Sequence, residues 1–223
     1  MLQRDYIMRM IAQLSAVLAK VIGLKSADKI EEKQQVLNEA LHDFTGLSEA
    51  TIERLSYRDL INLVSSIKEI NPEKCFMLAE LLKAKADVYF SLEDMDKSFN
   101  LYLKSFNIYV EVMLSNNSLY MEPNQSTIDQ TINRIKQFKV PYETQKLLFH
   151  YYERIMKYDK AEDALFELLN QGTHRNIILS EGAAFYERLR EKRPEELEEG
   201  NLPIDEVIEG MEKFQSFIGC DSD

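Results

Sequence analysis

The sequence has 223 residues, a formal net charge of -11 and 45% apolar residues, with only 7 glycines and 5 prolines. A chain of this length can bury a sizeable core without metals or disulfides, and the low glycine and proline content favours helices over a fold with many strands. The acidic balance is the opposite of the basic face that a nucleic-acid-binding protein needs. Cys75 and Cys220 stand in no CxxC motif, which is typical of a reduced, cytoplasmic protein.

The first 24 residues are apolar enough to raise the question of a signal peptide or a membrane span. Both need an uninterrupted apolar core, and Arg9, Gln13 and Lys20 interrupt this one. We therefore expect an amphipathic helix and no membrane span. The basic residues of this helix leave open a third reading, in which it holds the protein on a membrane surface.

This first helix carries an apolar stripe at alternating spacings of three and four residues. Such a stripe either packs on the helix's own domain or, over three heptads, forms a coiled-coil seam between two copies of the chain. Both readings stay open from the sequence. The candidate homodimer seam consists of Ile7, Met10, Leu14, Val17 and Val21.

The rest of the chain reads as a succession of helices, because no run alternates apolar and polar residues with a period of two. Ser48 and Ser56 are capping candidates, and Asn71-Pro72 ends one helix and starts the next. The longest expected loop is SNNSLYMEPNQS. The expected helices cover residues 26–42, a short segment from 48, 56–70, 72–91, 97–115, 126–138, 141–156, 160–169, 176–192 and 205–217.

Two segments resemble tetratricopeptide repeats, which are helical hairpins with a Gly-x2-Tyr pattern on the first helix and Ala-x3-Phe on the second. Both segments lack the repeat's tryptophan, and alanine or phenylalanine replaces the glycine. The small residue lets the two helices approach closely. We therefore expect an all-α, tetratricopeptide-like stack of antiparallel helical hairpins, an α–α superhelix. The positions that correspond to the repeat pattern are Ala86, Tyr89, Ser98 and Tyr102 in one segment, and Phe149, Tyr152, Ala161 and Leu165 in the other, with Ala86 and Phe149 in place of glycine.

A stack needs several hairpins to bury its apolar faces, so we expect residues 1–223 to form a single all-helical domain. Residues 1–71 would hold the N-terminal helices and the possible dimer seam. Residues 72–172 would hold the two clear hairpins with an irregular one between them. Residues 173–223, which are strongly acidic, would cap the end of the stack.

The inner face of such a stack is the expected binding surface, and the candidates there are Lys83, Asp87, Lys146 and His150. Repeat domains that clamp a peptide's C-terminal carboxylate use Lys, Asn and Arg. Asp87 and the lack of Asn and Arg at these positions argue against a carboxylate clamp. The face either binds a peptide or protein segment, or is solvated or covered by the chain's own C-terminal segment.

No catalytic, cofactor or metal site is predicted. Glu39 and His42 form a Glu-x-x-His pair, but the second pair that a di-iron bundle requires is absent. Glycine-rich phosphate loops, HExxH and GxSxG are also absent from the sequence. The rival to a binding module is an enzyme or small-ligand carrier, with a pocket between hairpins lined by Tyr89, Tyr102, His150 and Tyr152.

Both ends of the chain resemble a family of uncharacterised bacterial proteins of about this length. The N-terminal likeness is in DYIMRMIAQL, and the C-terminal one lies between Phe185 and Val207. The resemblance implies a bacterial cytoplasmic protein with tetratricopeptide-like helices, and it implies no activity. The matching C-terminal residues are Phe185, Tyr186, Glu187, Leu189, Leu197, Gly200, Leu202, Pro203, Glu206 and Val207.

Together these features predict a non-enzymatic protein-interaction or scaffold module. Its partner would be a protein or peptide of unknown identity, and the chain itself could pair as a homodimer.

Overall fold

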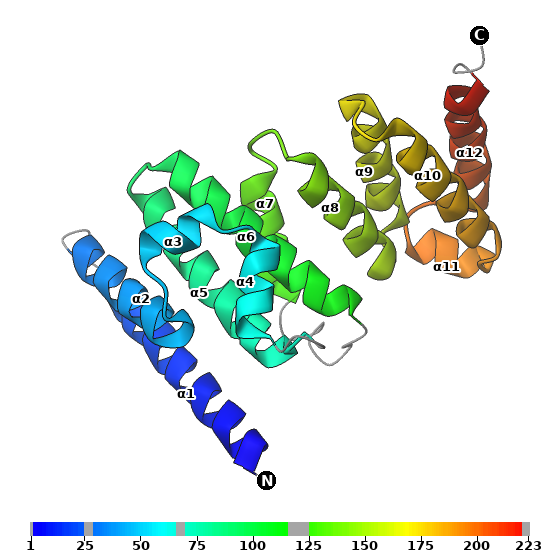
Figure 1. Ribbon diagram of the computed structural model, residues 1–223. Coiled ribbons are helices and arrows are strands. Elements are labelled where there is room, and N and C mark those ends of the chain that lie inside the picture. The colour runs from blue at the N-terminus through cyan, green and yellow to red at the C-terminus, as the bar shows by residue number, and fades with distance from the viewer. Residues whose placement is uncertain (1, 25–28, 66–69, 116–124, 220–223) are drawn as a thin grey trace. The chain divides into compact units, whose positions relative to one another are not determined.

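The structure, a computed structural model, describes residues 2–24, 29–65, 70–115 and 125–219. Every regular element within these residues is an α-helix, so the expected all-α class is confirmed (Figure 1). The helices are α1 (Leu2–Gly23), α2 (Ile30–Thr45), α3 (Glu49–Arg54), α4 (Tyr57–Val64), α5 (Pro72–Ser91), α6 (Met95–Leu114), α7 (Gln125–Ile135), α8 (Tyr142–Arg154), α9 (Tyr158–Gln171), α10 (Arg175–Arg190), α11 (Pro194–Glu199) and α12 (Ile204–Gly219).

Local capping explains where several of these helices begin. The side chains of Ser48, Ser56 and Asn71 each accept a hydrogen bond from a backbone N–H three residues on, and Ser56 forms a capping box with Asp59. Pro72 follows at the first helical position. The predicted starts after Ser48, Ser56 and Asn71 are therefore confirmed. The expected start at Ser26 lies outside the described residues, and the short helix α11 was not predicted as a separate element.

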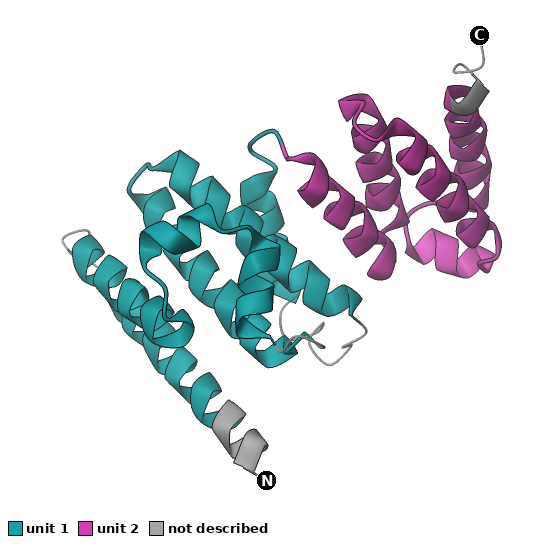
Figure 2. Cartoon of the chain, in the orientation of Figure 1, with its two compact units in different colours: residues 1–139 teal, residues 140–223 magenta. Residues whose placement is uncertain are grey.

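The chain divides into two compact units, residues 1–139 and 140–223 (Figure 2). Unit 1 contains α1 to α7, and unit 2 contains α8 to α12. The junction falls inside the segment 72–172 that the sequence assigned to two hairpins and an irregular one. Each of the two predicted hairpins accordingly lies within a different unit.

The hairpin α5–α6 forms the centre of unit 1, because α1, α2 and α4 pack on α5 while α3, α4 and α7 pack on α6. Within α6, residues 104–110 are all buried, as expected for a helix that is covered on all sides. A tight turn joins the two helices, with Glu93 in the left-handed region at φ 61° and Asp94 capping α6. Both helices therefore face neighbours over most of their surface.

Two buried serines bring α5 and α6 close together. Ser98 Oγ donates to the carbonyl oxygen of Ala86 at 3.0 Å, and Ser105 Oγ donates to that of Ala79 at 2.8 Å. Their small volume allows the helices to approach, and the hydrogen bonds satisfy hydroxyls that would otherwise be buried without partners. The pairing of 98 with 86 and of 105 with 79 shows that the helices run antiparallel.

Helix α1 lies at the edge of unit 1 and packs on α2 and α5 (Figure 1). Of the predicted seam residues, Met10, Leu14 and Val21 are buried within the chain and Val17 is half-buried. Ile7 lies in α1, but its side chain is outside the described side chains. This stripe therefore packs within its own unit, and a dimer that used it would have to open that packing.

A buried polar network fastens α3 to the core of unit 1. The Lys85 side chain is only 2% exposed, lies 2.7 Å from a carboxylate oxygen of Glu49 and donates to Asn38. Glu49 also accepts a hydrogen bond from the Tyr89 hydroxyl. Lys104 Nζ donates to the carbonyl oxygen of Ile52 at 2.8 Å and to that of Glu53 at 2.6 Å. These bonds fix a short helix that its own apolar contacts would hold only weakly.

Unit 2 packs α8 against α9, α9 against α10, and α10 against α12. Two glycines permit contacts that any side chain would block. A Cβ on Gly182 of α10 would lie 2.1 Å from the Phe214 ring of α12, and one on Gly200 would lie 2.1 Å from the Tyr158 ring. The backbone of Tyr158 also donates to the Gly200 carbonyl oxygen at 2.9 Å. These contacts tie α11 and α12 to the hairpin α8–α9 and to α10.

Candidate functional site

A cleft of about 350 Å³, lined by polar side chains, lies between α5, α6 and α7 of unit 1. We call it the polar cleft. It contains two of the four residues that the sequence predicted on the inner face, Lys83 and Asp87. The complete lining is Lys83 and Asp87 of α5, Tyr102 of α6, and Gln130, Asn133 and Arg134 of α7.

On the α5 side of the polar cleft, an ion pair and a hydrogen bond hold the side chain of Asp87 in place. Lys83 Nζ lies 3.0 Å from Asp87 Oδ2, one helical turn away, and the buried Tyr102 hydroxyl donates to Asp87 Oδ1. Burial, and then the hydrogen bond to Asp87, raise the pKa of Tyr102, so the phenol stays a neutral donor. Both oxygens of Asp87 are therefore engaged, although this carboxylate remains 46% exposed.

Helix α7 supplies the opposite wall because it is strongly amphipathic. Its apolar face buries Ile128, Ile132 and Ile135, so Asn133 and Arg134 fall on the polar side. The Arg134 guanidinium carbon stands 3.9 Å from the centroid of the Phe90 ring. This cation–π contact orients the guanidinium while leaving its N–H groups available for a ligand.

The polar cleft combines groups that suit an extended peptide. Lys83 and Arg134 place two cations against the single carboxylate of Asp87, in a chain whose net charge is -11. The amides of Gln130 and Asn133 can donate to and accept from a peptide backbone. Asn133 and Arg134 were not predicted as site residues, because the repeat pattern indicates binding positions only in the two clear hairpins. Their position opposite the apolar stripe of the expected helix 126–138 was the available signal.

The other two predicted inner-face residues lie in unit 2, where both approach Glu181 of α10. Lys146 Nζ is 2.6 Å from one Glu181 oxygen, and His150 Nε2 is 3.9 Å from the other. Burial lowers the pKa of His150, so the imidazole is neutral near pH 7, and its ring packs against Phe149. Lys146 therefore helps to join α8 to α10, whereas the neutral His150 ring at 3.9 Å makes neither an ion pair nor a hydrogen bond with Glu181. They belong to unit 2, whereas the residues that line the polar cleft all belong to unit 1.

A family model with the description "Family of unknown function (DUF6483)" matches residues 1–219. The chain belongs to this family. The resemblance seen at both ends of the sequence, to an uncharacterised family, is thereby confirmed. No curated protein and no solved structure gives a significant match to the chain.

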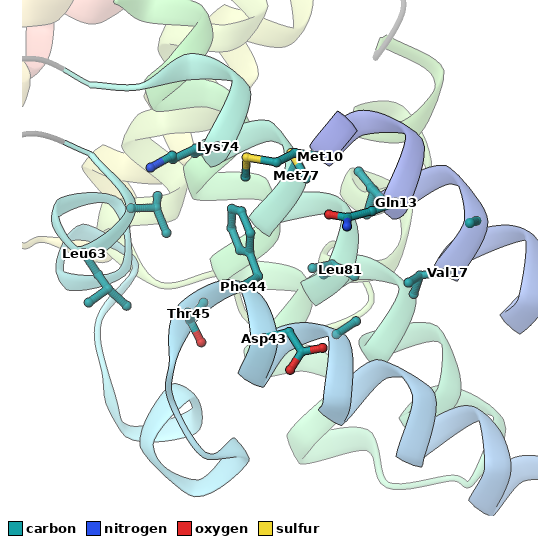
Figure 3. A pocket seen from close by; sticks show the side chains of 14 residues that line it. Met10, Gln13, Val17, Asp43, Phe44, Thr45, Leu63, Lys74, Met77 and Leu81 are labelled. Atoms are coloured by element: carbon teal, nitrogen blue, oxygen red, sulfur yellow. The ribbon is translucent and has the colours of Figure 1, made fainter. Parts of the chain in front are cut away.

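A second and larger hollow of about 630 Å³ opens between α1, α2, α4 and α5 of the DUF6483 chain. Figure 3 shows Met10, Phe44 and Met77 turned toward this space from three different helices. Asp43 and Lys74 lie at different parts of its rim (Figure 3). The hollow is thus mainly apolar, with a few polar groups at its edge, as is usual for sites that bind small molecules.

The rival pocket predicted from Tyr89, Tyr102, His150 and Tyr152 is not assembled within either unit. Tyr102 lines the polar cleft, and the Tyr89 hydroxyl binds Glu49 in the network that fastens α3. His150 and Tyr152 lie in unit 2. These four side chains therefore serve different local contacts.

Three further features bear on chemistry. The pKa of the buried Cys75 thiol is raised by burial, which makes it a poor nucleophile. The described residues hold no group of three or more His, Cys, Asp or Glu side chains placed to bind a metal ion. Among the same residues, no helix combines the length and the apolar character needed to cross a membrane.

Proposed function

We propose that this chain is a non-enzymatic, cytoplasmic interaction module that binds an acidic, extended segment of a partner protein in the polar cleft. The observation that carries the proposal is the convergence of Lys83, Arg134 and Asn133 on one hollow from helices that are far apart in sequence. A carboxylate of the partner would bind the two cations, and Gln130 and Asn133 would bind its backbone.

The same proposal includes a tetratricopeptide-like stack as the scaffold. The hairpins α5–α6 and α8–α9 support it, because each closes around a buried small residue, Ser98 or Ala161, at the repeat's position. The family resemblance at the ends of the sequence supports a bacterial source. The sequence has two cysteines, and the described one, Cys75, is a free thiol, which is compatible with the cytoplasm.

The experiment is a selection from a displayed library of random peptides, carried out with the purified full chain. We expect peptides rich in Asp and Glu to be enriched. Their affinity should fall at least about tenfold for Arg134→Gln, since a charge-assisted contact is lost. The matched control is Arg190→Gln, because Arg190 is 53% exposed and pairs only locally with Glu187 in unit 2.

A second variant tests whether the polar cleft prefers acidic to basic peptides. Asp87→Asn removes the carboxylate that competes for Lys83, while it keeps the shape of the side chain and the contact with Tyr102. An acidic peptide should therefore bind more tightly to Asp87→Asn, and a basic peptide more weakly. The proposal fails if no peptide is enriched, or if Arg134→Gln and Arg190→Gln bind the enriched peptides equally well.

The rival function, a small-ligand carrier, is favoured by one observation, the apolar hollow of about 630 Å³ (Figure 3). Its ligand would carry an apolar body between Met10, Phe44 and Met77. Native mass spectrometry of the chain purified from its host would show an added mass under this hypothesis. Ala40→Phe, which adds a ring to the lining, should remove that mass, and an unliganded spectrum would exclude the carrier.

A further inference from the structure

The polar cleft continues into a second hollow across the surface of α5. This second hollow, of about 280 Å³, opens between α1, α2 and α5, and we call it the side pocket. Lys83 and Asp87 line both hollows, so the two meet at the ion pair that these side chains form. Figure 1 shows α1 and α2 on one side of α5 and α7 on the other. A ligand that occupies the polar cleft therefore has the side pocket within reach.

The spacing of residues along α5 explains why the two hollows differ in polarity. The α5 residues that line them follow the three-and-four rhythm of one helix face, and at 100° per residue they span about 140° of the circumference. Lys83 and Asp87 lie toward one edge of this strip, whereas Ala84 and Val88 lie toward the other. The polar edge lines the polar cleft, and the apolar edge faces α1 and α2. The whole strip consists of Glu80, Lys83, Ala84, Asp87, Val88 and Ser91.

The walls of the side pocket are mainly aliphatic. Val21 and Val88 are buried, whereas Ile22 is 72% exposed, so that the unit itself covers little of this side chain. A volume of about 280 Å³ lies below the usual range for a site that holds a small molecule, and it suits one large side chain of a partner instead. The apolar lining is Leu18, Val21, Ile22, Ile30, Ala84 and Val88.

The charges around the two hollows favour an acidic partner. Three cations and two carboxylates line them, which leaves a local positive excess in a chain whose net charge is -11. Burial also raises the pKa of the Glu80 carboxyl, which weakens the negative side of this balance. Such a surface attracts acidic segments and repels basic ones. The cations are Lys33, Lys83 and Arg134, and the carboxylates are Glu80 and Asp87.

We propose that the side pocket is a second subsite for the partner segment in the polar cleft, and that it takes one large apolar side chain of that segment. This inference rests on the proposed function, in which an acidic residue of the segment binds Lys83 and Arg134. The two hollows lie at opposite edges of the α5 strip, about one helix diameter or roughly 10 Å apart. An extended chain covers about 3.3 Å per residue. The apolar residue should therefore stand about three positions from the acidic one.

The second subsite supplies affinity that the polar cleft lacks. An ion pair at exposed side chains contributes little, because water and salt screen it. Burial of a leucine or phenylalanine side chain contributes more, because it removes apolar surface from water. Replacing the apolar residue of the bound segment with alanine should therefore weaken binding about tenfold or more.

The probe is a displayed library of short random peptides, selected on the purified full chain. We expect the enriched peptides to share an acidic residue and a large apolar residue about three positions apart. Fluorescence anisotropy then gives the Kd of one enriched peptide and of its version with alanine at the apolar position. Arg134→Gln should weaken the binding of both peptides, since both keep the acidic residue.

Two variants of the side pocket should weaken only the peptide that keeps its apolar residue. Ala84→Phe fills the pocket, and Ile22→Ser removes apolar surface from its lining; each should raise the Kd of this peptide about tenfold and leave that of the alanine version unchanged. Because Ile22 is exposed, Ile22→Ser stays folded even if Ala84→Phe does not, and circular dichroism checks both. The matched control is Ile177→Ser, since Ile177 is a 50% exposed isoleucine of α10 in unit 2.

The outcomes separate this inference from the proposed function. Acidic peptides without an apolar residue at a constant distance overturn the side pocket as a subsite and leave the proposed function standing. Selection of no acidic peptide overturns both. Equal effects of Ile22→Ser and Ile177→Ser overturn the subsite as well. Sedimentation velocity of the peptide-free chain tests the other occupant, because a dimer that Ile22→Ser dissociates would assign the pocket to a second copy and overturn the inference.

Discussion

Replacing Gly182 by alanine tests how tightly α10 and α12 pack in unit 2. In the interior of an isolated helix this change stabilises, because alanine is favoured over glycine by about 1 kcal/mol. Here the added Cβ would lie 2.1 Å from Cζ and 2.6 Å from Cε1 of the Phe214 ring. The ring must retreat by more than an ångström before the contact reaches ordinary van der Waals distance.

The Phe214 ring has little room to move. The side chain is 1% exposed, and its ring centroid lies 5.6 Å from that of Tyr186 and 6.0 Å from that of Phe166. Overpacking a filled core costs about 1–3 kcal/mol and sometimes more. A contact this short belongs at the upper end of that range. After subtraction of the helix propensity gained, we expect Gly182→Ala to lower the free energy of unfolding by about 2 kcal/mol.

Urea denaturation followed by far-UV circular dichroism measures the change, and hydrogen exchange locates it in α10 and α12. The matched control is Gly23→Ala, because a Cβ on Gly23 at the end of α1 meets nothing within 4 Å. The control should match the wild type or exceed its stability slightly. Phe214→Leu should partly rescue Gly182→Ala in a double-mutant cycle. If Gly182→Ala is as stable as the wild type, the close packing of α10 on α12 is refuted.

Three further changes test unit 1. Glu49→Ala should cost about 3–5 kcal/mol, because it leaves the charge of Lys85 buried without its carboxylate; an equal effect of the exposed Glu32→Ala would contradict this. In urea denaturation, Ser98→Leu should lower the free energy of unfolding by about 1–3 kcal/mol, because the larger side chain pushes α5 away from α6. Ser98→Ala should lower it by only about 1 kcal/mol, since it removes just the hydrogen bond to Ala86. Burial lowers the pKa of Lys104 from 10.5 to about 8. Between these pH values the unfolded chain therefore binds more protons than the folded chain, so the free energy of unfolding of the wild type should rise from pH 8 to 10.5 relative to that of Lys104→Met. If the difference between these two free energies stays constant across the range, the charge of Lys104 is not buried.

The lining of the polar cleft was only partly predicted from the sequence. Lys83 and Asp87 were predicted because they occupy the inner-helix positions at which peptide-binding tetratricopeptide repeats place their polar residues. Asn133 and Arg134 were not, because α7 follows the expected loop SNNSLYMEPNQS and matches no repeat spacing. Their approach to α5 depends on how α7 packs on α6. No local sequence pattern specifies how closely α7 approaches α5.

The sequence by itself determined the helices and several of their starts, because capping side chains and apolar periodicity act within a few residues of one another. Ser56 with Asp59, and Asn71 with Pro72, are complete signals of this kind. Only the tertiary structure decided which stripe of α1 faces inward and which residues share the polar cleft. It also placed Lys146 and His150 beside Glu181. Those outcomes depend on packing between segments far apart in the chain, where the volume and position of each neighbour select one face over another.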